Sequence, residues 1–315
     1  MFIPLRRFLA VLALTWSPLA LGAPLAYVPN EGSGTLSIID TAVDQVVGEI
    51  AVGAKPRGTV VSGDGRTAYV SDQGRNELVV VDLVARKRIG AVPLGESPEG
   101  LGMSPDGRWV AAACEEANEV AFVDTRTRTE VFSVKVSGKN PEHAVFSPDG
   151  RHVFVSAEDG AAIDVIDVER RAQVAQIAVG TRPRGIVFSA DGRLAFVAAE
   201  LSNEVYVIDA VRFKVVRAIP AGVRSNGLAL HPDGQRLYVS NGGEATVSVI
   251  DLASHRVVAT IPVGQRPWNM ALTPDGAKLY VACGRSGVVT VIDTVTNRRL
   301  GDVAVGKLPW GVVVR

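Results

Sequence analysis

The sequence repeats one short pattern seven times along its length. Each copy is a run of mostly apolar residues that ends in an aspartate, as in residues 78–82 (LVVVD). The aspartates follow one another at intervals of 42 or 43 residues: Asp40, Asp82, Asp124, Asp167, Asp209, Asp251 and Asp293. Copies at a constant spacing indicate that a single supersecondary unit is stacked on itself through the chain. The repeat therefore predicts one domain, although 315 residues could form two.

One full unit, residues 56–95, contains four strand-like segments separated by turn residues. The segments are 58–62, 68–71, 78–82 and 88–94, with Gly, Asp and Asn between them. Such a pattern predicts antiparallel strands joined by tight turns. The third segment is almost wholly apolar, as in a strand covered on both faces, whereas Arg and Lys near the fourth suit an exposed edge. The sequence predicts an all-β fold, a single seven-bladed β-propeller of four-stranded antiparallel blades.

The two ends of the chain fall inside the same repeat unit. Residues 25–28 have the pattern of a second strand, and residues 310–314 have the pattern of a first strand. We therefore predict that the C-terminal strand completes the N-terminal blade, with residues 312–314 beside Tyr27 and Val28. This pairing closes the ring without an exposed edge.

Residues 1–22 have the pattern of a secretory signal peptide. Arg6 and Arg7 precede an apolar segment that begins at Phe8, and small residues around Gly22 offer a cleavage site. The apolar segment is too short to span a bilayer comfortably. We expect export to the periplasm, a propeller formed by residues 23–315, and no membrane span after cleavage.

Several second strands resemble a known repeat. Residues 67–71 (TAYVS), 237–241 (LYVSN) and 279–283 (LYVAC) follow Asp-Gly turns and are similar to the YVTN repeats of bacterial β-propellers. The opening, residues 26–36 (AYVPNEGSGTL), resembles the β-propeller proteins associated with PQQ-dependent catabolism. This resemblance implies a non-catalytic binding or accessory protein that works beside quinoprotein alcohol oxidation in the periplasm. The implied partners are a quinoprotein dehydrogenase or its electron-transfer or transport partners, with PQQ involved only indirectly.

The chain offers few residues for cofactor chemistry. It has no Cys-x-x-Cys-His motif for covalent haem, and Cys114 and Cys283 occupy equivalent positions four blades apart, too distant to pair. The aligned aspartates open turns, where Asp commonly bonds backbone N–H groups, so we predict that they are structural. Equal numbers of basic and acidic residues, 33 of each, argue against a nucleic-acid partner. We expect no bound cofactor, no metal and no catalytic residue.

The loops from the outer strand of one blade to the inner strand of the next vary most. Each contains Gly-x-x-Pro followed by residues that differ from blade to blade, with Ser225 in place of Pro once. In a propeller such loops surround one mouth of the channel, which predicts a ligand or partner site there. The predicted site residues are Arg57, Glu99, Glu142, His143, Arg184, Asn226, Trp268 and Trp310. Loops from second to third strands open on the same face and bring Glu31, Gln73, Glu115, Glu158 and Glu200.

The two arginines of this set favour a small anionic ligand, because guanidinium groups bind planar anions bidentately. As loop residues, they are expected to contribute little to folding. The alternative is that the whole set is solvated and binds nothing.

Two other functions stay open. One is a hydrolase of the propeller-lactonase or strictosidine-synthase kind, with glutamates and the histidine at the mouth binding a metal or acting as a base. Such an enzyme should bring at least three metal-type ligands together in a buried polar cluster at the mouth. The other is a nucleic-acid or surface adhesion module, which should carry a basic or aromatic stripe on its outer face.

Overall fold

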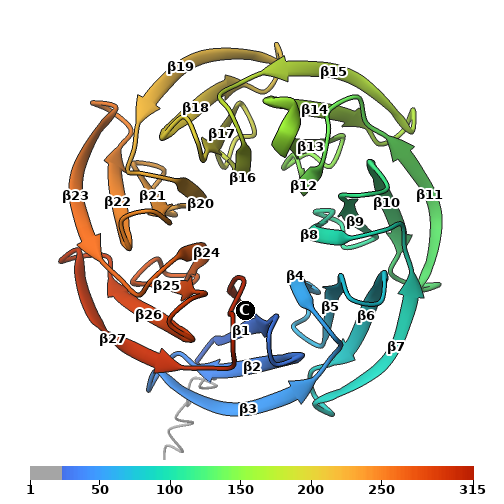
Figure 1. The fold of residues 1–315 in the computed structure, drawn as a ribbon, viewed down its shortest axis with the longest axis horizontal. Coiled ribbons are helices and arrows are strands. Elements are labelled where there is room, and N and C mark those ends of the chain that lie inside the picture. Colours follow the sequence, from blue (N-terminus) through green and yellow to red (C-terminus); the bar gives the residue numbers. More distant parts are fainter. Residues whose placement is uncertain (1–22) are drawn as a thin grey trace, which may run out of the picture.

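The computed structural model describes residues 23–315, so the predicted signal peptide, residues 1–22, lies outside the described residues. The described chain forms seven four-stranded antiparallel sheets arranged in a ring around one axis (Figure 1). The predicted seven-bladed propeller is therefore confirmed. Within residues 23–315, no helix is long and apolar enough to cross a membrane.

The strands are grouped by their place in the blade. The innermost strands are β4 (Pro56–Val61), β8 (Pro98–Met103), β12 (Pro141–Phe146), β16 (Pro183–Phe188), β20 (Ser225–Leu230), β24 (Pro267–Leu272) and β28 (Val313–Val314). The second strands are β1 (Leu25–Asn30), β5 (Thr67–Asp72), β9 (Trp109–Cys114), β13 (His152–Ala157), β17 (Leu194–Ala199), β21 (Arg236–Asn241) and β25 (Lys278–Cys283). The third strands are β2 (Thr35–Asp40), β6 (Glu77–Asp82), β10 (Glu119–Asp124), β14 (Ala162–Asp167), β18 (Glu204–Asp209), β22 (Thr246–Asp251) and β26 (Val288–Asp293). The outer strands are β3 (Gln45–Ala51), β7 (Lys87–Pro93), β11 (Thr129–Lys135), β15 (Ala172–Ala178), β19 (Lys214–Pro220), β23 (Arg256–Pro262) and β27 (Arg298–Ala304).

The burial of each strand follows its residue types. The four central residues of β6 are buried, whereas most of β7 is exposed or half-buried. The core lies between neighbouring blades: Tyr69 and Val80 of one blade pack with Val110 and Val123 of the next. Because both faces of each blade are covered, apolar residues occupy successive positions of the third strands instead of alternating.

Glycine at the third position of most inner strands lets neighbouring inner strands approach closely. A Cβ on Gly58 would lie 2.4 Å from the carbonyl oxygen of Glu99, and a Cβ on Gly227 would lie 2.4 Å from that of Trp268. A side chain at these positions would collide with backbone. Of the seven inner-strand segments, only two carry a side chain at this position, His143 and Asn269.

The C-terminal segment completes the first blade, as predicted (Figure 1). However, β28 has only two residues, and its register places Val313 opposite Tyr27 and Val314 opposite Ala26. The prediction that residues 312–314 lie beside Tyr27 and Val28 is therefore confirmed for the partner strand and for Tyr27, while the observed ladder is shorter and extends to Ala26 and not to Val28. As in the other inner strands, the register shifts after the first residue: Pro309 forms an isolated bridge with Asn30, and the ladder resumes at Val313.

The repeated aspartates cap turns, as predicted. The Oδ1 atom of Asp82, for example, accepts hydrogen bonds from the backbone N–H groups of Val84 (2.9 Å) and Ala85 (2.8 Å). Each of the other six accepts an equivalent bond from a residue two or three positions later. Cys114 and Cys283 are buried free thiols, in agreement with the prediction that they cannot pair.

Candidate functional site

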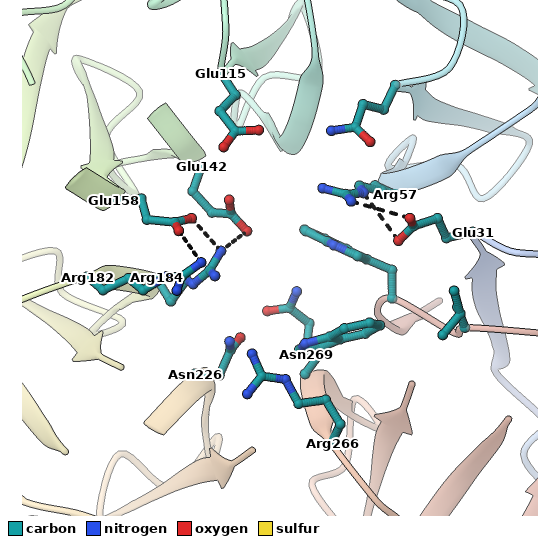
Figure 2. A pocket seen from close by; sticks show the side chains of 14 residues that line it. Glu31, Arg57, Glu115, Glu142, Glu158, Arg182, Arg184, Asn226, Arg266 and Asn269 are labelled. Atoms are coloured by element: carbon teal, nitrogen blue, oxygen red, sulfur yellow. Dashed lines mark hydrogen bonds and ion pairs between the residues drawn. The ribbon is translucent and has the colours of Figure 1, made fainter. Parts of the chain in front are cut away.

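One mouth of the ring is a polar cavity of about 430 Å³ to which all seven blades contribute. Six of the eight predicted site residues line it: Arg57, Glu142, Arg184, Asn226, Trp268 and Trp310. The second-to-third loops add Glu31, Gln73, Glu115 and Glu158. Figure 2 shows Glu115, Glu142 and Glu158 on one side of the cavity and Asn226, Asn269 and Arg266 on the other.

The other two predicted residues, Glu99 and His143, lie deeper. Glu99 is completely buried and accepts hydrogen bonds from Arg57 and from the side chain of Gln73. His143 lines a second cavity of about 130 Å³, which shares the wall residues Arg57, Asn269 and Trp310 with the first cavity. The smaller cavity, which we call the throat, therefore adjoins the mouth.

Arg184 is the most heavily paired residue of the mouth. Its Nη1 atom lies 2.6 Å from Oε1 of Glu142 and 2.7 Å from Oε2 of Glu158, and its Nε donates to Oε2 of Glu200 at 2.9 Å. Burial acts to lower the pKa of Arg184, but the charges of the three glutamates outweigh it and raise the pKa. The expectation that this arginine is a solvated loop charge is wrong, because its side chain is 89% buried among carboxylates.

Arg57 is also paired with carboxylates, on the side of the mouth opposite Arg184. Its guanidinium pairs with Glu99, and its Nε lies 3.3 Å from Oε2 of Glu31. These partners stand on β8 and on the β1–β2 loop, so the ion pairs connect three blades. The premise that Arg57 is an exposed loop charge is therefore wrong, because it compensates a completely buried carboxylate and its removal should destabilise the fold.

Glu200 is the centre of a second ion-pair group. It is completely buried and accepts hydrogen bonds at 2.9 Å from Nε of Arg184 and from Nη2 of Arg266. Nε of Arg182 lies 3.4 Å from the same carboxylate. Burial acts to raise the pKa of Glu200, but the charges of Arg184 and Arg266 outweigh it and lower the pKa.

Three glutamates converge at the acidic side of the mouth. One carboxylate oxygen of each of Glu115, Glu142 and Glu158 lies within 4.8 Å of the other two. Burial, reinforced by the charge of Glu142, raises the pKa of Glu158 to about 7 despite the nearby arginines. Burial acts to raise the pKa of Glu142, but the charge of Arg184 and a hydrogen bond with Glu158 outweigh it and lower the pKa. This group brings together three metal-type ligands at the mouth, as expected of an enzyme from the sequence, although only Glu142 and Glu158 are buried and Glu115 is half-buried.

The throat contains polar groups without partners. The His143 ring stacks on Trp310, with centroids 5.3 Å apart and ring planes at 21°. Within residues 23–315, neither ring nitrogen has a hydrogen-bond partner, and Oγ1 of Thr59 has none either. The Asn269 amide adjoins the ring without completing a hydrogen bond. Burial lowers the pKa of His143, so the imidazole is neutral at neutral pH.

Sequence reasoning missed four residues that line the mouth: Arg182, Arg266, Asn269 and Leu308. Three of them precede the proline of the Gly-x-x-Pro motif, and they have positive φ angles of 61°, 54° and 52°. That position differs from blade to blade as much as the one after proline, which would have been a usable signal. Asn269 was detectable because it replaces the glycine of most inner strands.

Comparison with known proteins identifies one β-propeller family that matches most of the chain. The sequence model of the family described as lactonase, 7-bladed beta-propeller matches residues 24–132 and 168–304. The unmatched segment between them, residues 133–167, carries Glu142, His143 and Glu158. No curated protein matches the sequence.

Solved structures share the architecture at low sequence identity. The chain resembles a chain of Kuenenia stuttgartiensis hydrazine synthase, with a TM-score of 0.79 and 24% identity over 90% of this chain and 99% of the other. It also resembles putative 6-phosphogluconolactonases from Bacteroides fragilis NCTC 9343 (TM-score 0.80, 18% identity, 95% and 100% covered) and Bacteroides uniformis ATCC 8492 (0.79, 21%, 93% and 99%). Identities this low establish the common fold. The finer resemblance to YVTN-repeat, PQQ-associated propellers stays a prediction.

Proposed function

The chain belongs to the seven-bladed β-propeller lactonase family, and on this premise we propose that it hydrolyses a small polar lactone at the mouth of the propeller. The observation that carries this proposal is the pair of adjoining cavities, a polar mouth above a throat with an unpartnered neutral histidine. Hydrolysis of a lactone needs a water molecule, a group that takes its proton, and donors for the oxyanion.

His143 is the proposed general base. A neutral imidazole can accept a proton, and its nitrogens have no competing partner among the described residues. The throat, which is lined by His143 and Thr59, is large enough for a water molecule. The water gives its proton to His143 as its oxygen attacks the carbonyl carbon of a lactone held in the mouth.

The amide side of the mouth supplies the donors. Asn226, Asn269 and Arg266 face the acidic side across the cavity (Figure 2). The amide N–H groups of Asn226 and Asn269 stabilise the negative charge on the carbonyl oxygen. Nη2 of Arg266 already bonds Glu200, so this arginine contributes mainly its charge. When the tetrahedral species collapses, the ring oxygen leaves and takes the proton back from the imidazolium. The product is the open hydroxy acid, so atoms and charge balance.

The lining also limits the substrate. Apart from Trp268, Trp310 and Leu308, every residue of the mouth is charged or carries an amide. Arg57 and Arg184 already hold glutamates, so they are less free to bind a strongly anionic group than the sequence suggested. We therefore favour a hydroxylated lactone over an apolar one, with its ring stacked on a tryptophan face.

The test is proton release from a panel of lactones by the protein comprising residues 23–315. The panel contains an aldonolactone, a phosphorylated sugar lactone and an alkyl γ-lactone, and we expect the first to be hydrolysed fastest. His143→Ala should lower kcat about 100-fold, and His255→Asn, on the opposite face, should leave it unchanged. The rate of the intact protein should rise with pH and reach half its maximum below pH 6.5, since the pKa of His143 is lowered. Absence of hydrolysis of every lactone would refute the function, whereas hydrolysis by His143→Ala at the full rate would refute only the role of His143.

The accessory role beside quinoprotein alcohol oxidation, in the periplasm and without a bound cofactor, stays a separate prediction from the resemblance. It depends on a partner protein and not on turnover. Impaired growth on ethanol of a strain without this gene, restored by His143→Ala, would favour it over hydrolysis.

A further inference from the structure

The acidic side of the mouth collects more negative charge than its arginines balance. Glu142 and Glu158 share Arg184, and Glu158 also pairs with Arg182. Glu115 has no cationic partner within the described chain, and its carboxylate accepts one hydrogen bond, from the hydroxyl of Ser97 at 3.2 Å. Figure 2 shows these three glutamates on the same side of the mouth, with Glu142 and Glu158 bonded to Arg184. They come from separate elements: the β9–β10 loop, β12 and η1 (Glu158–Gly160).

Glu99 provides a second, independent observation. Its side chain is completely buried, and its Oε2 atom has no hydrogen-bond partner in the described structure. The other oxygen is held by Arg57 and by Gln73, whose amide also donates to Ser97 at 2.8 Å. Since Ser97 in turn donates to Glu115, Glu99 is joined to the acidic group by a continuous chain of hydrogen bonds.

The electrostatics of Glu99 agree with this position. Burial, followed by the charges of Glu142 and Glu115, raises the pKa of Glu99 well above its ordinary value in spite of Arg57. A carboxylate with one unpaired, buried oxygen is costly unless a proton or a cation compensates it. A proton and a divalent cation would each compensate the charge of Glu99, and the arrangement of the neighbouring carboxylates favours the cation.

We propose that Glu115, Glu142 and Glu158 bind one divalent cation, in a site to which Glu99 is joined through Gln73 and Ser97. All the donors are carboxylate oxygens, which select hard cations such as Ca²⁺ and Mg²⁺ over Zn²⁺ or Cu²⁺. One oxygen of each carboxylate lies within 4.8 Å of the other two, so a single cation can reach all three. Ca²⁺ commonly binds several protein carboxylates, whereas Mg²⁺ keeps more of its waters and takes one or two. The number of carboxylates therefore favours Ca²⁺, in contrast to the expectation from the sequence that no metal binds.

The site is a feature of this chain more than of its family. Two of the three ligands, Glu142 and Glu158, lie in the segment that the family model does not match. Glu158 also belongs to the helical turn η1, which is present in this second-to-third loop alone among the described blades. The proposal does not depend on lactone hydrolysis, because cation binding is measured without a substrate.

The test is titration calorimetry of the chelator-treated protein, residues 23–315, with Ca²⁺, Mg²⁺ and Mn²⁺, together with thermal melting. We expect one Ca²⁺ per chain, a higher Tm, and weaker binding of Mg²⁺. Binding should tighten as the pH rises from 6 to 8, since the cation displaces the proton from Glu158.

Glu115→Gln is the decisive variant, because it removes a ligand that has no ion pair to lose and should leave the fold intact. We expect it to weaken Ca²⁺ binding at least roughly tenfold. Glu96→Gln, an exposed acid in the neighbouring β7–β8 loop, is the matched control and should bind like the intact protein. If millimolar Ca²⁺ neither releases heat nor raises the Tm, a shared proton compensates the glutamates and the proposal fails. Equal affinities of Glu115→Gln and the intact protein would also overturn it, because the cation would then bind elsewhere.

Discussion

The propeller has two sets of carboxylates, which differ in how far along the sequence their hydrogen-bond partners lie. The aspartates that end the third strands bond backbone N–H groups two or three residues further along. The glutamates of the mouth bond side chains of other blades instead. Glu99 and its partner Arg57 are 42 residues apart, and Glu200 and Arg266 are 66 residues apart. The first set therefore fixes local turns, whereas the second connects the blades to one another.

This difference teaches how function is carried by a repeat protein. A position with the same residue in every copy meets a requirement that every copy shares, here the turn after a third strand. A position that differs from copy to copy faces the axis, where each blade has different neighbours. Because the mouth residues share partners, a change in one should disturb several, while a change in a turn aspartate should stay local. The following predictions test that contrast.

The largest effect is expected for Arg184→Ala. It leaves Glu142, Glu158 and Glu200 without their shared cation, and all three are buried. Breaking a buried ion pair on one side costs about 3 kcal/mol or more. Urea denaturation should show this loss at pH 7 and a smaller loss at pH 5, where protons compensate the glutamates. An equal loss at both pH values would contradict the electrostatic explanation.

The fold could be predicted from the sequence because seven copies repeat the same evidence. The segment 78–82 differs from β6 by a single residue, and the outer strands lie where Arg and Lys indicated an exposed edge. The length of the C-terminal strand was less predictable, because its register shifts between Pro309 and Val313. The pattern of residue types does not reveal such a shift.

The location of the mouth could be predicted from the sequence, but the ion pairs within it could not. The sequence placed Arg57 and Arg184 at the axis, yet it gave no sign that glutamates from other blades bury them. Glu99 and Glu142 occupy the same position in their repeats, and only one of them lines the mouth. Whether each glutamate lines the mouth depends on which neighbouring blade provides its arginine partner. That arrangement exists only in the assembled ring.

A second prediction concerns pH. The pKa of Glu158 rises from an ordinary 4.5 to about 7 in the folded protein, so the folded state binds more protons than the unfolded state between these values. Its contribution to stability is fully present below pH 4.5 and is lost as the pH rises through 7. We expect a loss of about 2 kcal/mol between pH 5 and 8 in the absence of divalent cations. Denaturation of Glu158→Gln over the same range should show a flatter profile, and an unchanged slope would contradict the assignment.

A smaller effect is expected from the turns. Asp82→Ala removes two hydrogen bonds to the backbone of a single exposed turn. The expected loss is about 1 kcal/mol, since the N–H groups can bond water instead. Combined with Arg184→Ala, it should add to the other loss within error, because the two sites share no partner. A marked departure from additivity in urea denaturation would show that the turns are coupled to the mouth.

The smallest effect is expected for Arg212→Ala, which isolates burial as the cause of the contrast. Nη1 of Arg212 lies 2.7 Å from a carboxylate oxygen of Asp209, close to the 2.6 Å between Nη1 of Arg184 and Glu142. The chemistry and distance match, but the side chain of Arg212 is 75% exposed and that of Arg184 only 11%. Water and salt screen the exposed pair, and Asp209 keeps its backbone hydrogen bonds without the arginine. Arg212→Ala should therefore not change the urea midpoint measurably, at low or high salt. If it destabilised the protein as much as Arg184→Ala, the strength of the mouth pairs would come from the ion pair itself and not from the burial that the ring imposes.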